Sequence, residues 1–311
     1  MTSEKSIAAA GLSRAFFALA GLTWCLIAFG ALVRAKQAGL ACPDWPLCYG
    51  AVVPNLKLSG VIYEWGHRAL AGGVSVLYFI GAAFILRDAT LRPKLRAWVI
   101  GGGVLLLTQI VFGGLTVLIV HRGDGAARPA AWTVATHLIL GNSFAALSYV
   151  TALRLRDVSV RSPQSDGSPM GAADSWLARL WTASLLLQFG LGGAIAGNIA
   201  GLVCTEFPTC NAGIWFPSWT GFVGLQIFHR LNAYLLLALA TTLTIRWRRR
   251  TTLWKYSLFI LLACIAQAAV GALNIASYLH AAVTTLHSAL AALLFSATAA
   301  LTYERTRRCA S

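Results

Sequence analysis

Long apolar stretches, separated by short polar segments, make up most of the chain. Eight stretches are visible, at roughly 15–33, 62–86, 97–119, 132–153, 177–198, 222–245, 254–275 and 283–303. Each has about the length, roughly 20 residues, that an α-helix needs to cross a bilayer. The first stretch shows no clear cleavage signal, so we interpret it as a retained helix. The pattern therefore predicts an all-α integral membrane protein with eight transmembrane helices.

The composition supports this class. Of the 311 residues, 58% are hydrophobic and only 11% are charged, and the mean hydropathy is +0.69. These values are typical of membrane proteins. The net charge of +15 could indicate nucleic-acid binding, but most basic residues lie in segments that face the cytoplasm if the N-terminus does. This is the positive-inside bias. We predict a multi-pass protein of a bacterial inner membrane, with both termini cytoplasmic and no nucleic-acid partner.

Two segments of the chain repeat each other in one ungapped register. Each contains two cysteines, an acid, a proline and a His-Arg pair, and the second copy follows the first by 162 residues (204 − 42, 229 − 67). Internal repeats of this kind define an architecture. Each copy includes four apolar stretches, so both halves have the same orientation and are related by an axis along the membrane normal. We predict two parallel-repeat four-helix bundles: residues 1–157, a cytoplasmic linker at 158–176, and residues 177–311.

Four histidines lie in apolar stretches at matching positions of the two copies: His67, His137, His229 and His287. Polar side chains inside a membrane are costly and typically functional, although a lone histidine can also be a packing residue. Within each half, the two histidines lie on helices that can face each other across a bundle core. Two facing imidazoles suit axial ligation of haem iron, whereas zinc needs two further ligands. We predict one bis-histidine haem site in each half.

Three arginines lie near the outer ends of helices: Arg34, Arg68 and Arg230. Each could simply extend toward the membrane interface. Haem carries two propionates, however, and guanidinium is well shaped to bind a carboxylate. The three arginines are therefore candidates for propionate binding.

Two pairs of cysteines, each with five residues between them, lie in outer loops: Cys42 with Cys48, and Cys204 with Cys210. Disulfides can form there if the loops face the oxidising side, and loops this short give only modest stabilisation. A structural bridge and a redox-active or haem-adjacent role both fit the spacing. We predict one disulfide in each loop.

One polar position differs between the two copies. Glu64 lies three residues before His67, on the same face of a helix, and its counterpart in the second copy is Gln226. Glutamine keeps the shape and removes the charge. Glu64 could be a solvated carboxylate at the membrane edge, but the difference is expected if one half performs chemistry and the other only holds a cofactor. Glu64 is therefore the candidate catalytic residue.

Together these motifs resemble the haem A synthase family over essentially the whole chain. The resemblance rests on Gly39-Leu40-Ala41-Cys42, Glu64-x-x-His67-Arg68, Gly113-Gly114-Leu115-Thr116-Val117, His137-Leu138, the second cysteine loop, His229-Arg230 and His287. It implies that the N-terminal half binds haem O and oxidises its C8 methyl to a formyl group, giving haem A, with Glu64 essential. It implies that the C-terminal half holds haem b. The implied partners are haem O synthase (protohaem farnesyltransferase) as substrate donor, and cytochrome oxidase assembly factors.

The residues alone indicate a two-haem membrane protein and do not name the substrate methyl. A di-haem electron-transfer protein of the cytochrome b561 kind and a haem exporter are therefore alternatives. The difference between Glu64 and Gln226 favours an enzyme, because an electron carrier gains little from one carboxylate. A prenyltransferase needs paired aspartate motifs for magnesium diphosphate, and the ten acids of this chain are too scattered to form them.

Overall fold

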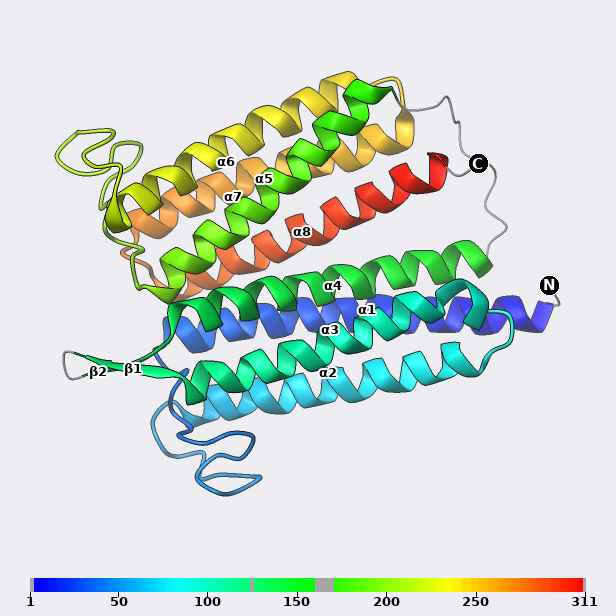
Figure 1. The fold of residues 1–311 in the computed structure, drawn as a ribbon, viewed down its shortest axis with the longest axis horizontal. Coiled ribbons are helices and arrows are strands. Elements are labelled where there is room, and N and C mark those ends of the chain that lie inside the picture. Colours follow the sequence, from blue (N-terminus) through cyan, green and yellow to red (C-terminus); the bar gives the residue numbers. More distant parts are fainter. Residues whose placement is uncertain (1–2, 124–125, 160–170, 310–311) are drawn as a thin grey trace.

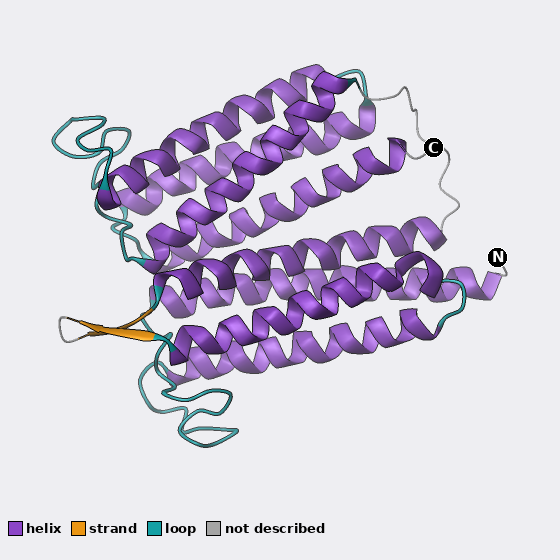
Figure 2. Ribbon diagram, in the orientation of Figure 1, coloured by secondary structure: helices purple, strands orange, loops and turns teal. Residues whose placement is uncertain are grey.

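The computed structural model describes residues 3–123, 126–159 and 171–309, which form eight α-helices and one β-hairpin (Figures 1 and 2). The helices are α1 (Ser3–Ala35), α2 (Val61–Arg87), α3 (Arg92–Leu118), α4 (Ala131–Ser159), α5 (Ala172–Gly197), α6 (Gly221–Arg246), α7 (Thr251–Ala276) and α8 (Ala281–Cys309). All eight are long and apolar enough to cross a membrane. The predicted all-α membrane fold with eight spans is confirmed.

The helices extend beyond the apolar stretches that predict them. α1 begins at Ser3, α4 continues to Ser159, and α5 begins at Ala172. The predicted linker at 158–176 therefore overlaps two helices, and its central part lies outside the described residues. Helices continue past the hydrocarbon core, where hydropathy no longer marks them. The apolar pattern also gives no sign of the hairpin, in which β1 (Val120–Gly123) pairs antiparallel with β2 (Ala126–Pro129).

The two ends of the molecule differ in what they carry. The hairpin and both cysteine-containing loops lie at one end, and α1 begins and α8 ends at the other (Figure 1). An even number of spans requires this arrangement. The loops at 36–60 and 198–220 are therefore on the same face of the molecule, as the repeat predicts.

The two halves differ in how closely their first and last helices pack against each other. α1 packs extensively on α4, which joins the first four helices into a ring, whereas the matching contact between α5 and α8 is slight. α8 packs instead on α1 and α4, and α4 also packs on α5. The halves therefore share a broad helical interface (Figure 1). Their division into two repeat-related bundles stays a prediction.

Two apolar clusters fill the interior. The first surrounds Tyr78, whose ring contacts Phe16 and Phe144 edge-on, with centroids 6.0 and 5.1 Å away. The Tyr78 hydroxyl donates a 2.6 Å hydrogen bond to a backbone carbonyl of α3, so this buried polar group is satisfied. The second cluster is built around Trp181 and Trp247. Tyr78 lies about three turns inward of His67, the candidate ligand on α2. The apolar cluster around Tyr78 therefore fills the inner part of that half, and the candidate polar residues lie in its outer part.

The junction between the halves depends on a close approach of α4 and α5. A Cβ added to Gly197 would meet backbone atoms of Ala131 at 2.7 Å, which is too close for any side chain. Because backbone cannot rotate away as a side chain can, Gly197→Ala must push the two helices apart. We expect this overpacking to cost about 1–3 kcal/mol, measured as a lower midpoint of thermal unfolding in detergent.

Gly190 supplies the matched control on the same helix. A Cβ at this position meets nothing within 4 Å. Gly190→Ala should therefore leave the midpoint unchanged or raise it, because alanine is the better helix former by about 1 kcal/mol. Equal midpoints for the two variants would contradict the close approach of α4 and α5.

Candidate haem-binding and catalytic site

The structure brings the four membrane histidines together as two pairs. His67 on α2 interacts electrostatically with His137 on α4, and His229 on α6 interacts with His287 on α8. α2 and α4 make no extensive contact with each other, and neither do α6 and α8. The rings of each pair therefore project toward one another from helices on opposite sides of a half. Haem ligation by these two pairs stays a prediction.

Each histidine ring rests on a glycine of the preceding helix. A Cβ on Gly30, Gly113, Gly192 or Gly271 would lie 2.9, 3.0, 3.3 or 3.2 Å from the Cε1 atom of His67, His137, His229 or His287, respectively. These separations are shorter than ordinary carbon contacts. Glycine is therefore required for the rings to lie where they do. This contact between a histidine ring and a glycine, which we call a glycine seat, occurs four times.

Three of the four rings also contact a glutamine, one turn before the glycine. The Nε2 atoms of His137, His229 and His287 each lie 3.3 Å from the side-chain Nε2 of a glutamine, respectively Gln109, Gln188 and Gln267. The sequence Gln-x-x-x-Gly therefore recurs on α3, α5 and α7. At His67 the corresponding residue is Leu26, and within the described part of the chain neither ring nitrogen of His67 has a hydrogen bond.

One of these contacts fixes the proton on its histidine. The Gln188 Oε1 atom accepts a 2.7 Å hydrogen bond from Asn232 Nδ2, so its Nε2 group must be the donor toward His229. The His229 Nε2 atom then accepts, which places the ring proton on Nδ1. Ser184 completes this Ser184–Gln188–Asn232 network by donating to Asn232 Oδ1 at 2.7 Å.

These features fit a haem in each half. Haem iron is bound by an imidazole nitrogen. At His229 the nitrogen with the lone pair is Nε2, because the ring proton is on Nδ1. The buried Nδ1 atoms of His67 and His287 have no partner. Among the residues that the structure describes, no three His, Cys, Asp or Glu side chains gather as ligands for a metal ion. Each half instead offers two donors from opposite sides, which is the number an iron needs above and below a porphyrin plane. The glycine seats keep the rings free of steric obstruction.

Glu64 is buried at the outer end of α2 and is bound to the first cysteine loop. The residue is 5% exposed. The Oε2 atom accepts a 2.8 Å hydrogen bond from the Cys42 backbone amide, and the Oε1 atom accepts one of 2.5 Å from Arg68. The counterpart Gln226 makes only a long 3.3 Å bond to the carbonyl of Gly201. The carboxylate therefore links the loop to the helix that carries His67.

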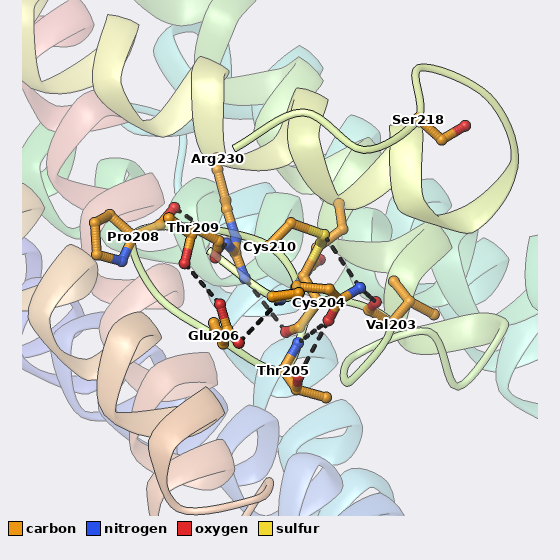
Figure 3. Close-up of a disulfide and its surroundings, with 12 residues drawn as sticks. Val203, Cys204, Thr205, Glu206, Pro208, Thr209, Cys210, Ser218 and Arg230 are labelled. Carbon is orange, nitrogen blue, oxygen red and sulfur yellow. Dashed lines mark hydrogen bonds between the residues drawn. A yellow bond between two sulfur atoms is a disulfide. The ribbon is translucent and has the colours of Figure 1, made fainter. Parts of the chain in front are cut away.

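Two of the three candidate propionate ligands already bind loop carbonyls. Arg68 donates to the carbonyls of Asp44 and Leu47 at 2.8 and 2.6 Å. Arg230 repeats this contact on the second loop, with a 2.7 Å bond to Thr209 (Figure 3). Arg34 differs, because within the described ranges its guanidinium has no hydrogen bond or ion pair. It lies one turn beyond Gly30 on α1, and is the arginine most free to bind a carboxylate.

Each cysteine loop is closed by a disulfide and by a carboxylate that caps a turn. The sulfur atoms of Cys42 and Cys48 are bonded, as are those of Cys204 and Cys210. Figure 3 shows the second loop, in which Glu206 accepts hydrogen bonds from the amides of residues 212 and 213 and from a threonine hydroxyl. Asp44 accepts from the amides of residues 49 and 50 in the first loop. Both predicted disulfides are present.

These hydrogen bonds favour the ionised carboxylates. The amide of Gly50 lowers the pKa of Asp44, with a further contribution from Tyr49, and the amide of Gly213 lowers the pKa of Glu206. A carboxylate with a lowered folded-state pKa stabilises the fold above its unfolded value, about 3.9 for Asp and 4.3 for Glu. That contribution is lost as the pH falls through the lower, folded-state value.

We therefore expect Asp44→Asn to loosen the first loop at neutral pH. A water-soluble phosphine should reduce Cys42–Cys48 faster in this variant than in the parent protein, and the parent should approach the same rate only in strong acid. Thiol alkylation and peptide mass spectrometry measure both rates. Cys204–Cys210 in the same molecule is the internal control, since Glu206 still holds that loop. Identical reduction rates of Cys42–Cys48 at neutral pH would refute the role of Asp44.

Sequence reasoning finds the histidines and misses their seats. The offset of 162 residues that relates the cysteine loops also relates Gly30 to Gly192, and extending the repeat upstream would have found them. The threefold Gln-x-x-x-Gly spacing is a second signal. Neither signal indicates that the glycine touches a histidine ring, because that contact depends on how consecutive helices pack.

Comparison with known proteins gives a consistent result. The sequence profile of the COX15-CtaA family, described as cytochrome oxidase assembly protein, matches residues 13–299. Proteins named heme A synthase are similar over most of the chain. The one from Shewanella oneidensis is 27% identical and the alignment covers 90% of this chain and 92% of that protein. Those from Halalkalibacterium halodurans and Symbiobacterium thermophilum are 28% and 29% identical, covering 86% and 92% of this chain and 88% and 91% of theirs.

Proposed function

The chain belongs to the COX15-CtaA family of cytochrome oxidase assembly proteins, and we propose that it is a haem A synthase. In this proposal it oxidises the C8 methyl group of haem O to a formyl group, and the product haem A supplies cytochrome oxidase. The observation that carries the proposal is a repeated histidine pair with an ionisable carboxylate, Glu64, beside only one copy. The similarity to proteins named heme A synthase supports the same reading.

The two halves have different tasks in this proposal. His229 and His287 hold a resident haem b in the C-terminal half, and His67 and His137 hold the substrate haem O in the N-terminal half. When bound, haem b supplies one-electron redox chemistry. The Ser184–Gln188–Asn232 network would prepare His229 for iron, since it keeps the ring proton on Nδ1 and the lone pair on Nε2.

Glu64 is the residue for the chemical step. With water as the oxygen donor, conversion of a methyl to a formyl group releases four protons and four electrons, and positive charge develops beside the ring. An electron acceptor in the membrane, outside this chain, must take up the electrons. A fixed carboxylate stabilises such charge, which is often the largest catalytic contribution. Each carboxylate oxygen has two lone pairs, so the bonds from Cys42 and Arg68 leave acceptor positions open on Glu64. The carboxylate can therefore also accept a proton from water or alcohol within reach.

The remaining assignments concern surroundings of the site. Arg34 is the propionate ligand best supported by the structure, and Arg68 and Arg230 act mainly as clamps on the loops. The cysteine loops face the outside of a bacterial inner membrane, and both termini face the cytoplasm, because most Lys and Arg lie in the segments and helix ends on the same side as the termini. Haem O synthase delivers the substrate, and assembly factors of cytochrome oxidase receive the product.

The charge of Glu64 should be needed for oxidation rather than for haem binding. Glu64→Gln imitates the C-terminal half, and we expect haem O to be retained with haem A formation reduced on the order of 100- to 1000-fold. Pigment extraction and chromatography after co-expression with a haem O source measure both. Gln226→Glu is the matched control and should barely change haem A formation.

The two failures of that experiment have different meanings. Normal haem A from Glu64→Gln would remove the carboxylate from the chemistry. Loss of all haem from the N-terminal half would show that the bonds to Cys42 and Arg68 are what matter, and Glu64 would become a structural residue. A purified parent protein that binds haem B alone would favour the electron-carrier alternative.

The resident haem should be six-coordinate and low-spin through His229 and His287. Replacing either histidine with alanine removes one axial ligand, so we expect this signal to disappear or to become high-spin in optical and electron paramagnetic resonance spectra. His280, exposed in the loop before α8, is the control, and His280→Ala should leave the signal intact. An unchanged low-spin signal in both ligand variants would exclude these two residues as the ligands.

A further inference from the structure

The two halves differ along one stripe beside the histidine of their second helix. In the C-terminal half this stripe is the Ser184–Gln188–Asn232 network, which ends at His229. Shifting each network position by 162 residues (184 − 22, 188 − 26, 232 − 70) gives a leucine every time: Leu22, Leu26 and Leu70. Three hydrogen-bonded polar residues in one half therefore correspond to three apolar residues in the other.

The N-terminal stripe has an order along the membrane normal. Leu22, Leu26, Gly30 and Arg34 are spaced four apart on α1, so each is the neighbour of the next in a row that winds slowly around the helix. Gly30 marks the level of the His67 ring, which lies against it. Arg34 lies one turn outward of that level, and the leucines lie one and two turns inward. From the outer to the inner side of the membrane, these positions therefore carry the Arg34 cation, then the glycine that contacts His67, and then two leucines.

This order matches the shape of a haem that bears a long alkyl tail. Such a molecule has carboxylates on one edge of its porphyrin and an isoprenoid chain on a pyrrole away from them. We propose that Leu22, Leu26 and Leu70 are specificity-determining residues that admit a tailed haem to the N-terminal site, while Ser184, Gln188 and Asn232 exclude it from the C-terminal site. The inference rests on the proposed function, which makes tailed haem O the substrate.

The discrimination comes mainly from exclusion. Lipid chains are as apolar as leucine, so transferring a tail from the bilayer to the leucine stripe changes its free energy little. A tail laid over the C-terminal stripe would instead separate the Gln188 and Asn232 amides from each other and from the hydroxyl and carbonyl of Ser184. Ser184 and Asn232 are 5% and 7% exposed, so the separated groups would have no water to turn to, and buried unpaired groups are costly. Proteins commonly achieve specificity through unfavourable interactions in the site that must reject a ligand.

The two stripes can be exchanged in the full-length protein. One variant carries Leu22→Ser, Leu26→Gln and Leu70→Asn, and the other carries Ser184→Leu, Gln188→Leu and Asn232→Leu. The first is combined with His229→Ala and His287→Ala and the second with His67→Ala and His137→Ala. Removing both histidines of the other half makes the retained haem report on the exchanged half. Both are purified from cells that make haem B and haem O, and the extracted pigments give the ratio of tailed haem, counted as haem O plus haem A, to haem B.

We expect the first exchange to lower the tailed share of the N-terminal site, and the second to raise that of the C-terminal site, each on the order of 10-fold or more relative to its histidine-variant parent. Leu77→Asn, at a 49% exposed position of α2, is the control for adding an amide to this helix and should leave the ratio unchanged. The single variants Leu26→Gln and Gln188→Leu should move the ratio in the same directions and guard against misfolding of the triple variants.

Two results would overturn the inference. One is an unchanged ratio in both exchanges. The other is loss of haem from the exchanged half without a change of ratio in the single variants, which would mean that these positions only orient the histidines or pack the helices. A parent with His229→Ala and His287→Ala that holds no tailed haem at all would instead refute the proposed function. Even then, the ratio of tailed haem to haem B in the second exchange would test separately whether the polar residues exclude a tailed haem from the C-terminal site.

Discussion

The contact between a histidine ring and a glycine on the preceding helix is the constraint on which the site depends. It occurs between α1 and α2, α3 and α4, α5 and α6, and α7 and α8. Small residues let membrane helices approach closely, and here the approach also delivers an imidazole to the interior. The chain is thus four helical hairpins of one design, each with a glycine seat on its first helix and a histidine on its second, and two hairpins make one candidate haem site.

The first hairpin departs from this design in several ways that belong together. It has a leucine where the others have a glutamine beside the ring, and it alone has an acid, Glu64, three residues before its histidine. Both changes affect the surroundings of His67 and leave its glycine seat intact. A site that holds a cofactor permanently gains from polar groups that fix its ligand, whereas a site that must accept and release a large apolar substrate does not. The concentration of changes in one hairpin therefore agrees with a division of labour between the halves.

The sequence predicts much of this and stops at a definite point. Eight spans, the histidines, the disulfide pairs and the Glu64–Gln226 difference all follow from hydropathy and from one repeat offset, because length, spacing and residue type are written in the chain. The glycine seats and the loop contacts of Arg68 and Arg230 do not follow, since they depend on how helices pack and which way a long side chain turns. An arginine after a candidate ligand histidine suits a propionate as well as a loop carbonyl, and only the hydrogen bonds tell which partner it has.

The second cysteine loop helps to decide what the first one requires. Glu64 bonds to the Cys42 amide and to Arg68, so a purely structural role for its carboxylate is conceivable. Yet the second loop has the same disulfide and the same arginine clamp, with an uncharged glutamine at the matching position. A loop of this design therefore closes without an acid there. Burying a charge at 5% exposure is costly even when it is paired, and a cost that loop closure does not require is most simply explained by the chemistry of the neighbouring site.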